Sequence, residues 1–363
     1  MTCYVLHALH VAGGPSPQYP PTYKAMHFLK NALPSLRSND LLDALQSLYE
    51  WNVKIDFATY INLVKIDSTN QYAEYKLTLL KKETGEKVSA DDVLIKRHET
   101  IFGNSYWGKE DNTWYDNSIQ LSLLAYKILE LDSSGKNYLP SICNYFLEQK
   151  GSTGFWRNTF ESAQILETII PQVINEKSNY SSPVKLRINE HEEVISDNSF
   201  SKKKIAPASA YQIEKEGAAP LYVSCSQQIL EPRPKEKDDY FSIKTSFITN
   251  EGTSDTLIAG KYATLHVNVQ VLKKSDYVMI TIPIPAGCSY ANKTIPTWHE
   301  THRQYFKDKV VIFCESLPEG NYSFDINLEP RFKGTYTINP TQAQLMYFPV
   351  LDGNNAGRKV KIY

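Results

Sequence analysis

The spacing of apolar residues changes once along this chain, near residue 180, and that change constrains the fold more than any other feature. Before it, apolar residues recur every three or four positions, as on one face of an α-helix. After residue 182 they recur at every second position, as on one face of a β-strand. A length of 363 residues is enough for two domains. We therefore predict an α + β multidomain chain, with helices in residues 1–178 and an antiparallel β-sandwich in residues 183–363.

Nine stretches of the first half carry helical spacing, and the short connections between them favour antiparallel helix pairs. Polar residues that can cap a helix precede several of these stretches: Asp40, Asp56, Asp116–Asn117 and Asn158. Asn158 and Glu161 have the spacing of a capping box. Pro171 is expected to end or kink the last helix, because proline cannot donate the backbone hydrogen bond that a helix interior needs.

Runs of alternating residues in the second half have the length of strands and end at turn signals such as PAG, LPEG and RFKG. The apolar positions of three such runs are Leu265, Val267, Val269 and Val271; Val278, Ile280, Ile282 and Ile284; and Tyr322, Phe324, Ile326 and Leu328. The polar stretch 196–218 is expected to form a hairpin and a loop. We expect no parallel sheet here, because parallel neighbours need crossovers of about a dozen residues, which few segments could supply.

Charge, cysteine and histidine content exclude several classes of function. The formal net charge is -1, so the chain as a whole is not biased toward nucleic acid or an anionic membrane. No apolar run approaches the roughly 20 residues that span a bilayer, and TCYVLHALHVAGG after Met1 lacks the features of a signal peptide. The five cysteines form no CxxC pair, and the histidines of WHETH, His299 and His302, are three residues apart rather than the four of a helical zinc motif. We expect no metal and no cofactor.

The tetrapeptide FLEQ, residues 146–149, matches an internal thioester motif, Cys-x-Glu-Gln, except at its first position. In that motif the cysteine sulfur is bonded to the glutamine side chain. Phe146 stands in place of the cysteine, on a helical stripe that begins at Leu139 and predicts a buried core position. Cys143 lies one turn earlier, at the wrong spacing. We therefore predict no thioester in this chain, and no catalytic residue stands out elsewhere.

Several motifs resemble one protein family over nearly the whole chain. WYDNSIQLSLLAYKILELD, FLEQK, GFW and TFESA resemble the later helices of the thioester-domain toroid in alpha-2-macroglobulins, with the bacterial, Bacteroides-type branch looking closest. The opening TCYVLHALHVAGG resembles a mid-toroid helix of the same family. Downstream, DYVMITIPIPAG, DKVVIFCESLPEGNYSF and LMYFP resemble its final macroglobulin-like β-sandwich. The resemblance implies an incomplete α/α toroid over residues 1–178, followed by that sandwich over residues 183–363.

The resemblance also implies a function. In that family the thioester lies early in the toroid, so FLEQ matches a later helix and its letters are a coincidence. The chain would be the non-catalytic C-terminal portion of a bacterial protein that traps proteases and defends the cell envelope. The implied partners are upstream domains of the same protein, a second copy, and proteases bound through the full-length protein. The implied location is the cell envelope, the periplasm or the extracellular space.

The alternative function is a carbohydrate-active enzyme, a polysaccharide lyase or related hydrolase, because such enzymes also join an α/α toroid to β-sandwiches. A lyase needs a Tyr or His base with a neutralising Asn or Arg in a deep cleft. Four aromatic residues around a glycine-containing loop are candidates either for stacking on sugars or for packing at the end of a helical ring: Tyr106, Trp107, Trp114 and Tyr115.

The first two helices supply a candidate interface. If the toroid lacks its opening helices, the apolar residues that would contact them are expected to be uncovered, and large uncovered apolar patches usually mark an interface. The candidate interface residues are Val5, Ala8, Leu9, Phe28 and Leu29.

Overall fold

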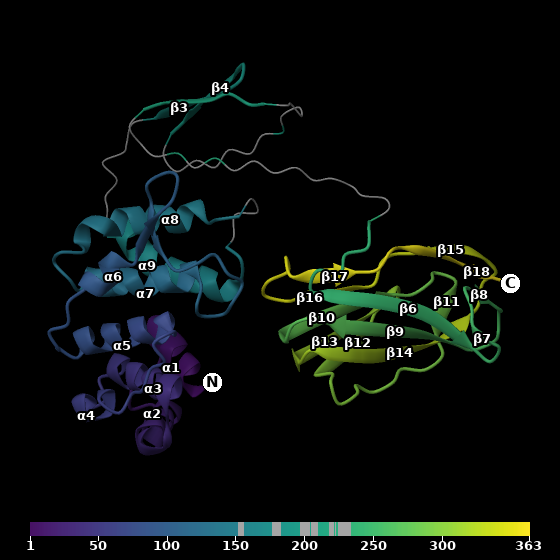
Figure 1. Cartoon of the computed structure of the whole chain (residues 1–363), viewed down its shortest axis with the longest axis horizontal. Helices are drawn as coiled ribbons and strands as arrows, with labels where there is room; N and C mark the ends of the chain where they lie inside the picture. The colour runs from purple at the N-terminus through teal and green to yellow at the C-terminus, as the bar shows by residue number, and fades with distance from the viewer. Residues whose placement is uncertain are drawn as a thin grey trace. The chain divides into compact units, whose positions relative to one another are not determined.

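The structure, a computed structural model, describes residues 1–151, 156–175, 183–196, 210–217 and 234–363, together with the single positions 204, 221 and 223. The chain divides into two compact units, Met1–Cys225 and Ser226–Tyr363 (Figure 1). In the sequence, a small antiparallel sheet in the order β4-β3-β5 follows the predicted helices and precedes the main strands. Its strands are β3 (Val184–Ile188), β4 (His191–Ile195) and β5 (Ile213–Glu216). The division after residue 225 thus groups this sheet with the helices, whereas we expected the sandwich to begin at residue 183.

The first unit contains helices at all nine predicted stretches, which confirms that part of the prediction. Their bounds are α1 (Thr2–Val11), α2 (Pro20–Ala32), α3 (Ser38–Glu50), α4 (Phe57–Ile61), α5 (Gln71–Glu83), α6 (Asp91–Ile95), α7 (Ser118–Glu130), α8 (Leu139–Glu148) and α9 (Thr159–Asn175). A hairpin of β1 (Arg97–Glu99) and β2 (Ser105–Trp107) lies between α6 and α7 in the sequence. Short 3-10 turns follow α2 and precede α8.

Three of the predicted helix caps are present. The side-chain oxygens of Asp56, Asn117 and Asn158 accept hydrogen bonds from backbone N–H groups three residues on, at 3.3, 3.0 and 2.8 Å. The predicted Asp40 cap is wrong, because α3 begins at Ser38 and Asp40 lies in its first turn. Its carboxylate there still interacts favourably with the positive end of the helix dipole. Of the two alternatives predicted for Pro171, an end of the helix is wrong, since α9 continues to Asn175.

The helical unit has two hydrophobic clusters, and α5 contributes to both. Ala73 and Leu80 of α5 pack with α1 to α4, whereas Tyr75 and Leu79 pack with α6 to α9 and β2. Residues only one or two positions apart on this helix, such as Leu79 and Leu80, therefore face different clusters, which explains why its apolar stripe is broad. Phe146 belongs to the second cluster and is 0% exposed, which confirms its predicted core position.

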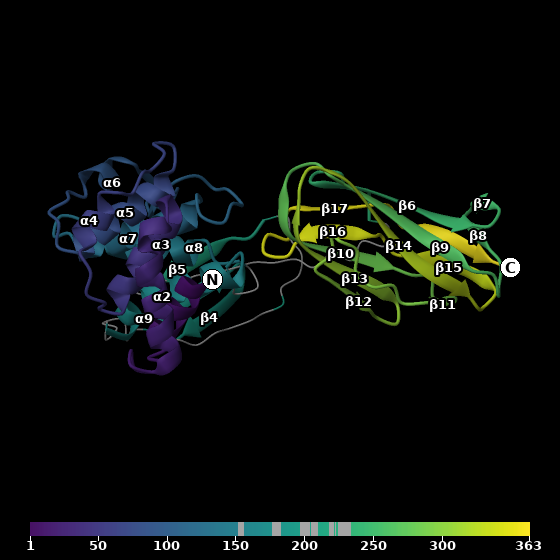
Figure 2. The ribbon, with the colours of Figure 1, turned by 90° about the horizontal axis from the view of Figure 1, so that it is seen from below.

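The second unit is built from two five-stranded sheets, whose strands lie in two layers (Figures 1 and 2). One sheet has the order β12-β13-β10-β16-β17 and the other β11-β14-β9-β6-β7. The strands of the first are β10 (Ser275–Pro283), β12 (His302–Tyr305), β13 (Lys309–Leu317), β16 (Gln342–Leu345) and β17 (Asp352–Asn354). Those of the second are β6 (Phe241–Thr249), β7 (Gly252–Thr253), β9 (Ala263–Val271), β11 (Cys288–Tyr290) and β14 (Gly320–Pro330). Both sheets are antiparallel throughout, which confirms the predicted sheet type.

The alternating residues of these strands form the core between the layers. Val267 and Val269 of β9, Ile280 and Ile282 of β10, and Ile326 of β14 are all fully buried. Their neighbours in sequence alternate with them toward solvent, as the period of two predicts. Burial of one face of each sheet also fixes the register, because a slip by one residue would turn every one of these side chains outward.

A third small sheet contains the one departure from antiparallel pairing among the described strands. Its order is β15-β18-β8, formed by β15 (Gly334–Ile338), β18 (Arg358–Ile362) and β8 (Thr256–Leu257). β8 and β18 pair in parallel over two residues. Our expectation of no parallel pairing was therefore wrong here. The connection between the two strands runs through most of the sandwich, so no dedicated crossover is needed.

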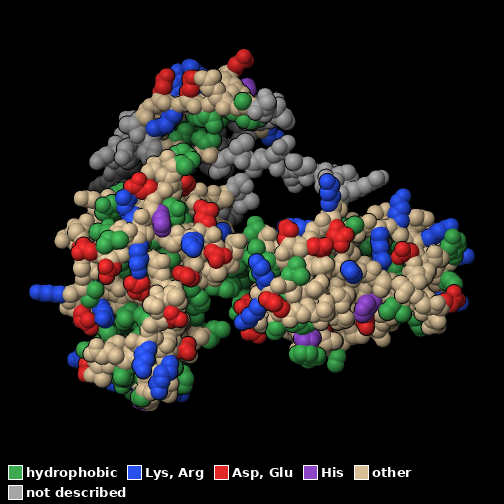
Figure 3. All heavy atoms as spheres, in the orientation of Figure 1, with side chains coloured by type: hydrophobic (Ala, Val, Ile, Leu, Met, Phe, Trp, Pro, Cys, Tyr) green, Lys and Arg blue, Asp and Glu red, His purple; other side chains and the backbone are tan. Residues whose placement is uncertain are grey.

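No helix in the part of the chain that the structure describes is long and apolar enough to cross a membrane. On the face drawn in Figure 3, acidic and basic side chains are interspersed over each unit. This distribution agrees with the near-zero net charge. Recognition of a charged partner would therefore depend on local groups rather than on the field of the whole molecule.

Candidate functional site

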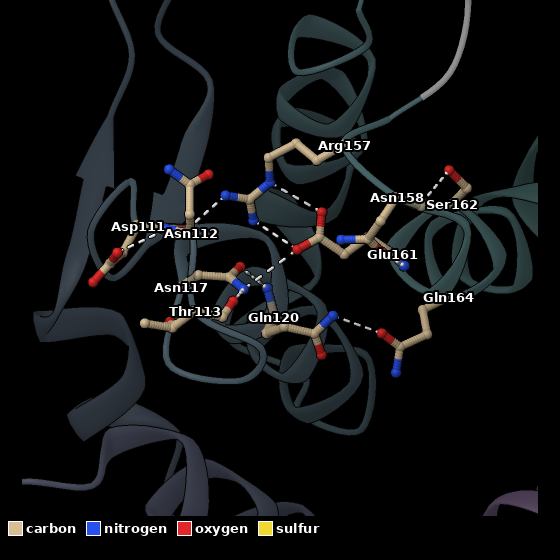
Figure 4. A network of polar contacts seen from close by, with 10 residues as sticks. All are labelled: Asp111, Asn112, Thr113, Asn117, Gln120, Arg157, Asn158, Glu161, Ser162 and Gln164. Atoms are coloured by element: carbon tan, nitrogen blue, oxygen red, sulfur yellow. Dashed lines mark hydrogen bonds and ion pairs between the residues drawn. The ribbon is translucent and has the colours of Figure 1, made fainter. Parts of the chain in front are cut away.

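A buried carboxylate anchors a polar network where α7 and α9 begin (Figure 4). Glu161, in the first turn of α9, is 1% exposed. The guanidinium of Arg157 donates to both of its oxygens, with Nε to Oε2 at 3.0 Å and Nη2 to Oε1 at 2.6 Å. Such a two-bond pair fixes orientation as well as position, because the planar donor fork matches the carboxylate. The Arg157–Glu161 pair therefore holds the entry to α9 rigidly.

The same pair holds the loop that precedes α7. Arg157 Nη1 donates to the backbone oxygen of Asp111 at 2.6 Å. Asn117 Nδ2 donates to the backbone oxygen of Thr113 at 2.7 Å and to Glu161 Oε1 at 3.3 Å. In Figure 4 these side chains converge from the loop and from α9 on one carboxylate. The loop 111–117 is thus attached to α9 at several points, although about 45 residues separate them in sequence.

The network is suited to positioning and not to proton transfer. A general acid or base must reach a substrate and change its protonation state near the working pH. Both oxygens of Glu161 already accept charge-assisted or amide hydrogen bonds, and its side chain has almost no contact with solvent. A hydrogen bond between two glutamine side chains, from Gln120 Nε2 to Gln164 Oε1 at 2.6 Å, also joins α7 to α9. These contacts fix the loop before α7 and give it no reactive group.

That loop carries two of the predicted aromatic residues into a cluster of five. The aromatic cluster, as we call it, consists of Tyr4, Tyr72, Trp114, Tyr115 and Phe160. The hydroxyl oxygens of Tyr4 and Tyr115 are 2.7 Å apart. Ring centroids are 5.1 Å apart for Tyr72 and Tyr115, 6.1 Å for Trp114 and Phe160, and 6.2 Å for Tyr4 and Phe160. Residues from α1, α5, α9 and the loop therefore meet on one surface.

Part of the aromatic cluster is open to solvent. Tyr4 is 44% exposed and Tyr115 is 42% exposed, whereas Tyr72, Trp114 and Phe160 are half-buried beneath or beside them. Partial burial and the hydrogen bond to Tyr115 raise the pKa of Tyr4 well above its usual range. The Tyr4 hydroxyl therefore stays protonated at neutral pH. The cluster presents aromatic rings with polar tips, which is the composition of many recognition surfaces.

The other two predicted aromatic residues lie elsewhere. Trp107 is 0% exposed, and its Nε1 donates to the backbone oxygen of Val93 at 2.5 Å. Tyr106 stacks on Tyr145 at 5.1 Å between centroids. Trp107 is thus a core residue, as the packing alternative predicted, and a single platform of all four residues is excluded by its burial. Tyr4, Tyr72 and Phe160 were missed because each lies on a separate helix, and nothing in the local sequence links them to the loop.

A second polar group joins the first helix of this unit to α3 and α9. The imidazole of His7 lies between two carboxylates, with Nδ1 3.1 Å from Glu50 and Nε2 3.3 Å from Glu167. The hydrogen bond to Glu167, and then that to Glu50, raise the pKa of His7 to about 9. The protonated imidazole therefore bridges three helices at neutral pH.

We expect the contribution of His7 to stability to fall as the pH rises. Its folded-state pKa of about 9 lies above the value of roughly 6.5 of an unfolded histidine, so protonation favours the folded state. The contribution is complete below pH ~6.5 and is lost as the pH passes ~9. Urea unfolding of the wild type and of His7→Gln across this range measures it, and the difference between them should shrink. A difference that does not vary with pH, or one reproduced by the exposed-site variant His27→Gln, would contradict the assignment.

The remaining chemical candidates from the sequence do not assemble into a reactive site. In WHETH, Glu300 is bound by Arg303 in a buried ion pair, and the ring of His299 packs edge-on against Tyr322. Within the described ranges, no three His, Cys, Asp or Glu residues are grouped so that they could hold a metal ion. Cys225, one of the five cysteines, lies outside the described residues.

The predicted interface residues are divided between surface and core. Val5, Ala8 and Phe28 are exposed, as expected for an uncovered surface, and Leu9 is half-buried. Leu29 is only 4% exposed and belongs to the hydrophobic cluster of α1 to α5, so its inclusion was wrong. Helical spacing predicted that Leu29 lies on the exposed face of α2, whereas its side chain packs into this cluster.

Two open depressions lie beside α4, and Ile55 and Asp56 line both of them. Their volumes are about 400 and 640 Å³. Residues of α2, α3 and α5 complete their walls, and none of the four aromatic residues predicted for sugar binding lines either one. Neither depression therefore combines those aromatic residues with a base.

Sequence comparison identifies one segment of the chain. Residues 235–349 match the family model described as the bacterial alpha-2-macroglobulin MG10 domain. This segment covers most of the two five-stranded sheets. No curated protein matches the chain.

Structural comparison extends over almost the whole chain. The structure of Escherichia coli alpha-2-macroglobulin from domain MG7 to the C-terminus has 13% sequence identity and a TM-score of 0.61, and the match covers 99% of this chain and 62% of that one. The Salmonella protein reacted with methylamine gives 12% identity and a TM-score of 0.60, with coverage of 99% and 25%. Native E. coli alpha-2-macroglobulin gives 12% and 0.61, with coverage of 100% and 25%. The chain thus spans a quarter of the length of the longer structures, and at this identity the likeness shows the fold alone.

Proposed function

We propose that this chain forms the C-terminal, non-catalytic part of a bacterial alpha-2-macroglobulin-like protein. The observation that carries the proposal is the match of residues 235–349 to the bacterial MG10 family. The fold similarity over 99% of the chain to the E. coli segment that ends at the C-terminus supports it, because both units are included. Residues 1–178 then correspond to an incomplete α/α toroid and residues 183–363 to the region of the final sandwich.

The proposal assigns the chain a supporting role in protease trapping. Alpha-2-macroglobulins, to which the chain is similar, are protease inhibitors rather than enzymes. Proteases would accordingly be bound through a longer protein, with upstream domains or a second copy as the direct partners of this chain. Val5, Ala8 and Phe28 stay our candidates for that contact. The cell envelope, periplasm or extracellular space is the expected location.

The proposal includes the absence of a thioester from these residues. Phe146 fills the core where the motif would need cysteine, so Gln149 has no sulfur partner at that position. Cys143 lies on the preceding turn of α8 and is half-buried. The half-buried Gln149 is the C-cap residue of α8 and carries an ordinary amide.

We expect the chain to be unreactive toward methylamine and toward polysaccharides. An amine opens a thioester and adds to its glutamine, whereas an unactivated amide does not react. Intact-mass measurement before and after treatment should therefore show no adduct, with the Salmonella protein, which has been crystallised after this reaction, as the positive control. Incubation with a panel of acidic and neutral polysaccharides should release neither unsaturated nor reducing ends. An adduct at Gln149 would refute the missing thioester, and turnover of any polysaccharide would favour the lyase or hydrolase alternative.

A further inference from the structure

We propose that the aromatic cluster is a binding surface for a protein segment that carries arginine. The proposal rests on the contacts of the helical unit and is independent of the family to which the chain is assigned. It requires three properties of the surface: exposed ring faces, negative charge nearby, and a backbone that is ordered before binding. Each is present.

The cluster already accommodates one cation of its own chain. Lys76 on α5 forms an ion pair with Asp43 on α3, and its Nζ lies 5.7 Å from the centroid of the Tyr72 ring. An ammonium group at this distance from a ring face is attracted by the negative charge density of the ring. Burial, followed by the Asp43 carboxylate, raises the pKa of Tyr72 above its usual range. On the Tyr72 side of the cluster, Lys76 thus interacts with both a carboxylate and a tyrosine ring.

The Tyr115 side offers the same two elements, and no lysine or arginine in the described part of the chain lies over its ring. Tyr4 is 44% and Tyr115 42% exposed, and the segment 109–116, to which Tyr115 belongs, carries three exposed carboxylates and one lysine. The exposed acidic residues are Glu110, Asp111 and Asp116, and the basic one is Lys109. The segment thus has an excess of negative charge, which favours a cationic partner over a neutral or anionic one.

The loop is held in place before any partner arrives. Arg157 and Glu161 attach the backbone of the loop to α9, and Asn117 caps α7 while donating to Thr113. A binding surface that is already ordered loses little conformational entropy on binding. The network of Figure 4 thereby gains a role, because it positions Trp114 and Tyr115 without touching the partner.

Arginine fits the surface better than lysine or a sugar. A guanidinium can stack on an aromatic face and still donate hydrogen bonds at its edge to a carboxylate or a tyrosine hydroxyl. A sugar would stack on a flat platform of rings, but these rings are inclined to one another by 40°, 72° and 64°. A neutral sugar would also gain nothing from the carboxylates. The surface therefore favours an arginine-bearing segment of a partner protein.

Calorimetric titration of the full chain with short peptides tests the proposal. The probes are peptides of glycine and serine that carry arginine, lysine or glutamate at the same positions, together with a neutral xylo- or cello-oligosaccharide. We expect the arginine peptide to bind, the lysine peptide to bind more weakly, and the glutamate peptide and the oligosaccharide not to bind. Raising the salt concentration should weaken the binding of the arginine peptide, because part of the attraction is between exposed charges.

Variants of the exposed loop separate the aromatic cluster from the rest of the surface. Tyr115→Ala should weaken binding of the arginine peptide about two- to fivefold, the range of an exposed cation–π contact. Tyr115→Phe keeps the ring and should retain most of the affinity. Tyr23→Ala removes a tyrosine of similar exposure on α2, outside the cluster, and should change nothing. Circular dichroism confirms that each variant is folded.

Several results would overturn the proposal. These are no binding of the arginine peptide, equal binding of the glutamate peptide, or an affinity that Tyr115→Ala leaves unchanged. Binding of the oligosaccharide that Tyr115→Ala abolishes would instead identify a sugar site. None of these results bears on methylamine reactivity, so failure here and failure of the proposed function are distinguishable.

Discussion

Replacing Phe146 by alanine is expected to lower the free energy of unfolding of the helical unit by about 3–5 kcal/mol. The ring is 0% exposed and lies in the hydrophobic cluster of α5 to α9. Its centroid is 5.9 Å from that of Tyr145, and its backbone oxygen accepts a hydrogen bond from Trp156 Nε1 at 2.7 Å. Truncation removes the buried ring and leaves a cavity, because helices fixed on several sides cannot close completely over it.

Urea unfolding followed by tryptophan fluorescence measures this loss. Four of the five tryptophans lie in the helical unit, and the buried Trp107 gives the folded state a distinct signal. Phe28→Ala is the matched control, because it removes the same kind of side chain at a site on α2 that is 61% exposed. This change should lower the free energy of unfolding by roughly 0.5 kcal/mol or less. Similar values for the two variants would contradict the assignment of Phe146 to the core. They would also remove the physical reason for phenylalanine at the position where a thioester needs cysteine.

Periodicity predicted the elements of this protein well because it reports a local property. Apolar residues that recur every two positions form one face of a strand, and those that recur every 3.6 positions form one face of a helix. Burial of that apolar face stabilises the strand or helix. The alternating valines and isoleucines of β9 and β10, and the stripe around Phe146, were therefore identified before the structure was known. Caps were predictable for the same reason, since Asp56 and Asn158 bond to groups only three residues away.

Contacts between distant residues were not predictable in this way. Tyr4 and Tyr115 meet across 111 positions, and Arg157 reaches the backbone of Asp111 across 46. Only the packing of α1 and α7 against α9 brings these groups together, and no local pattern encodes that packing. Trp114 and Tyr115 lie together because they share a loop, and their role in binding stays a prediction. Trp107, at the end of a short strand, faces the core instead.

Breaking the buried ion pair between Glu300 and Arg303 is expected to destabilise the sandwich by about 3–5 kcal/mol. The side chains are 0% and 2% exposed, and the guanidinium donates to both carboxylate oxygens, at 2.7 and 2.6 Å. Arg303 also donates to the backbone oxygen of Asp325 at 3.0 Å, which connects edge strand β12 of one sheet to β14 of the other. Arg303→Met would leave the Glu300 carboxylate buried without its partner, and removal from water is costly for an unpaired charge.

The double variant Glu300→Leu/Arg303→Met separates the value of the pair from the penalty of breaking it. A buried ion pair loses much of its attraction to the cost of removing two charges from water, so an apolar pair of similar size should be less harmful than either single change. We expect the double variant to be more stable than Arg303→Met alone. Hydrogen exchange of the peptides that cover β12 and β13 measures the local stability in the wild type, in each single variant and in the double variant. If the two single losses simply add in the double variant, the ion pair is not the source of the effect. The donation to Asp325 would then account for the stability of this edge.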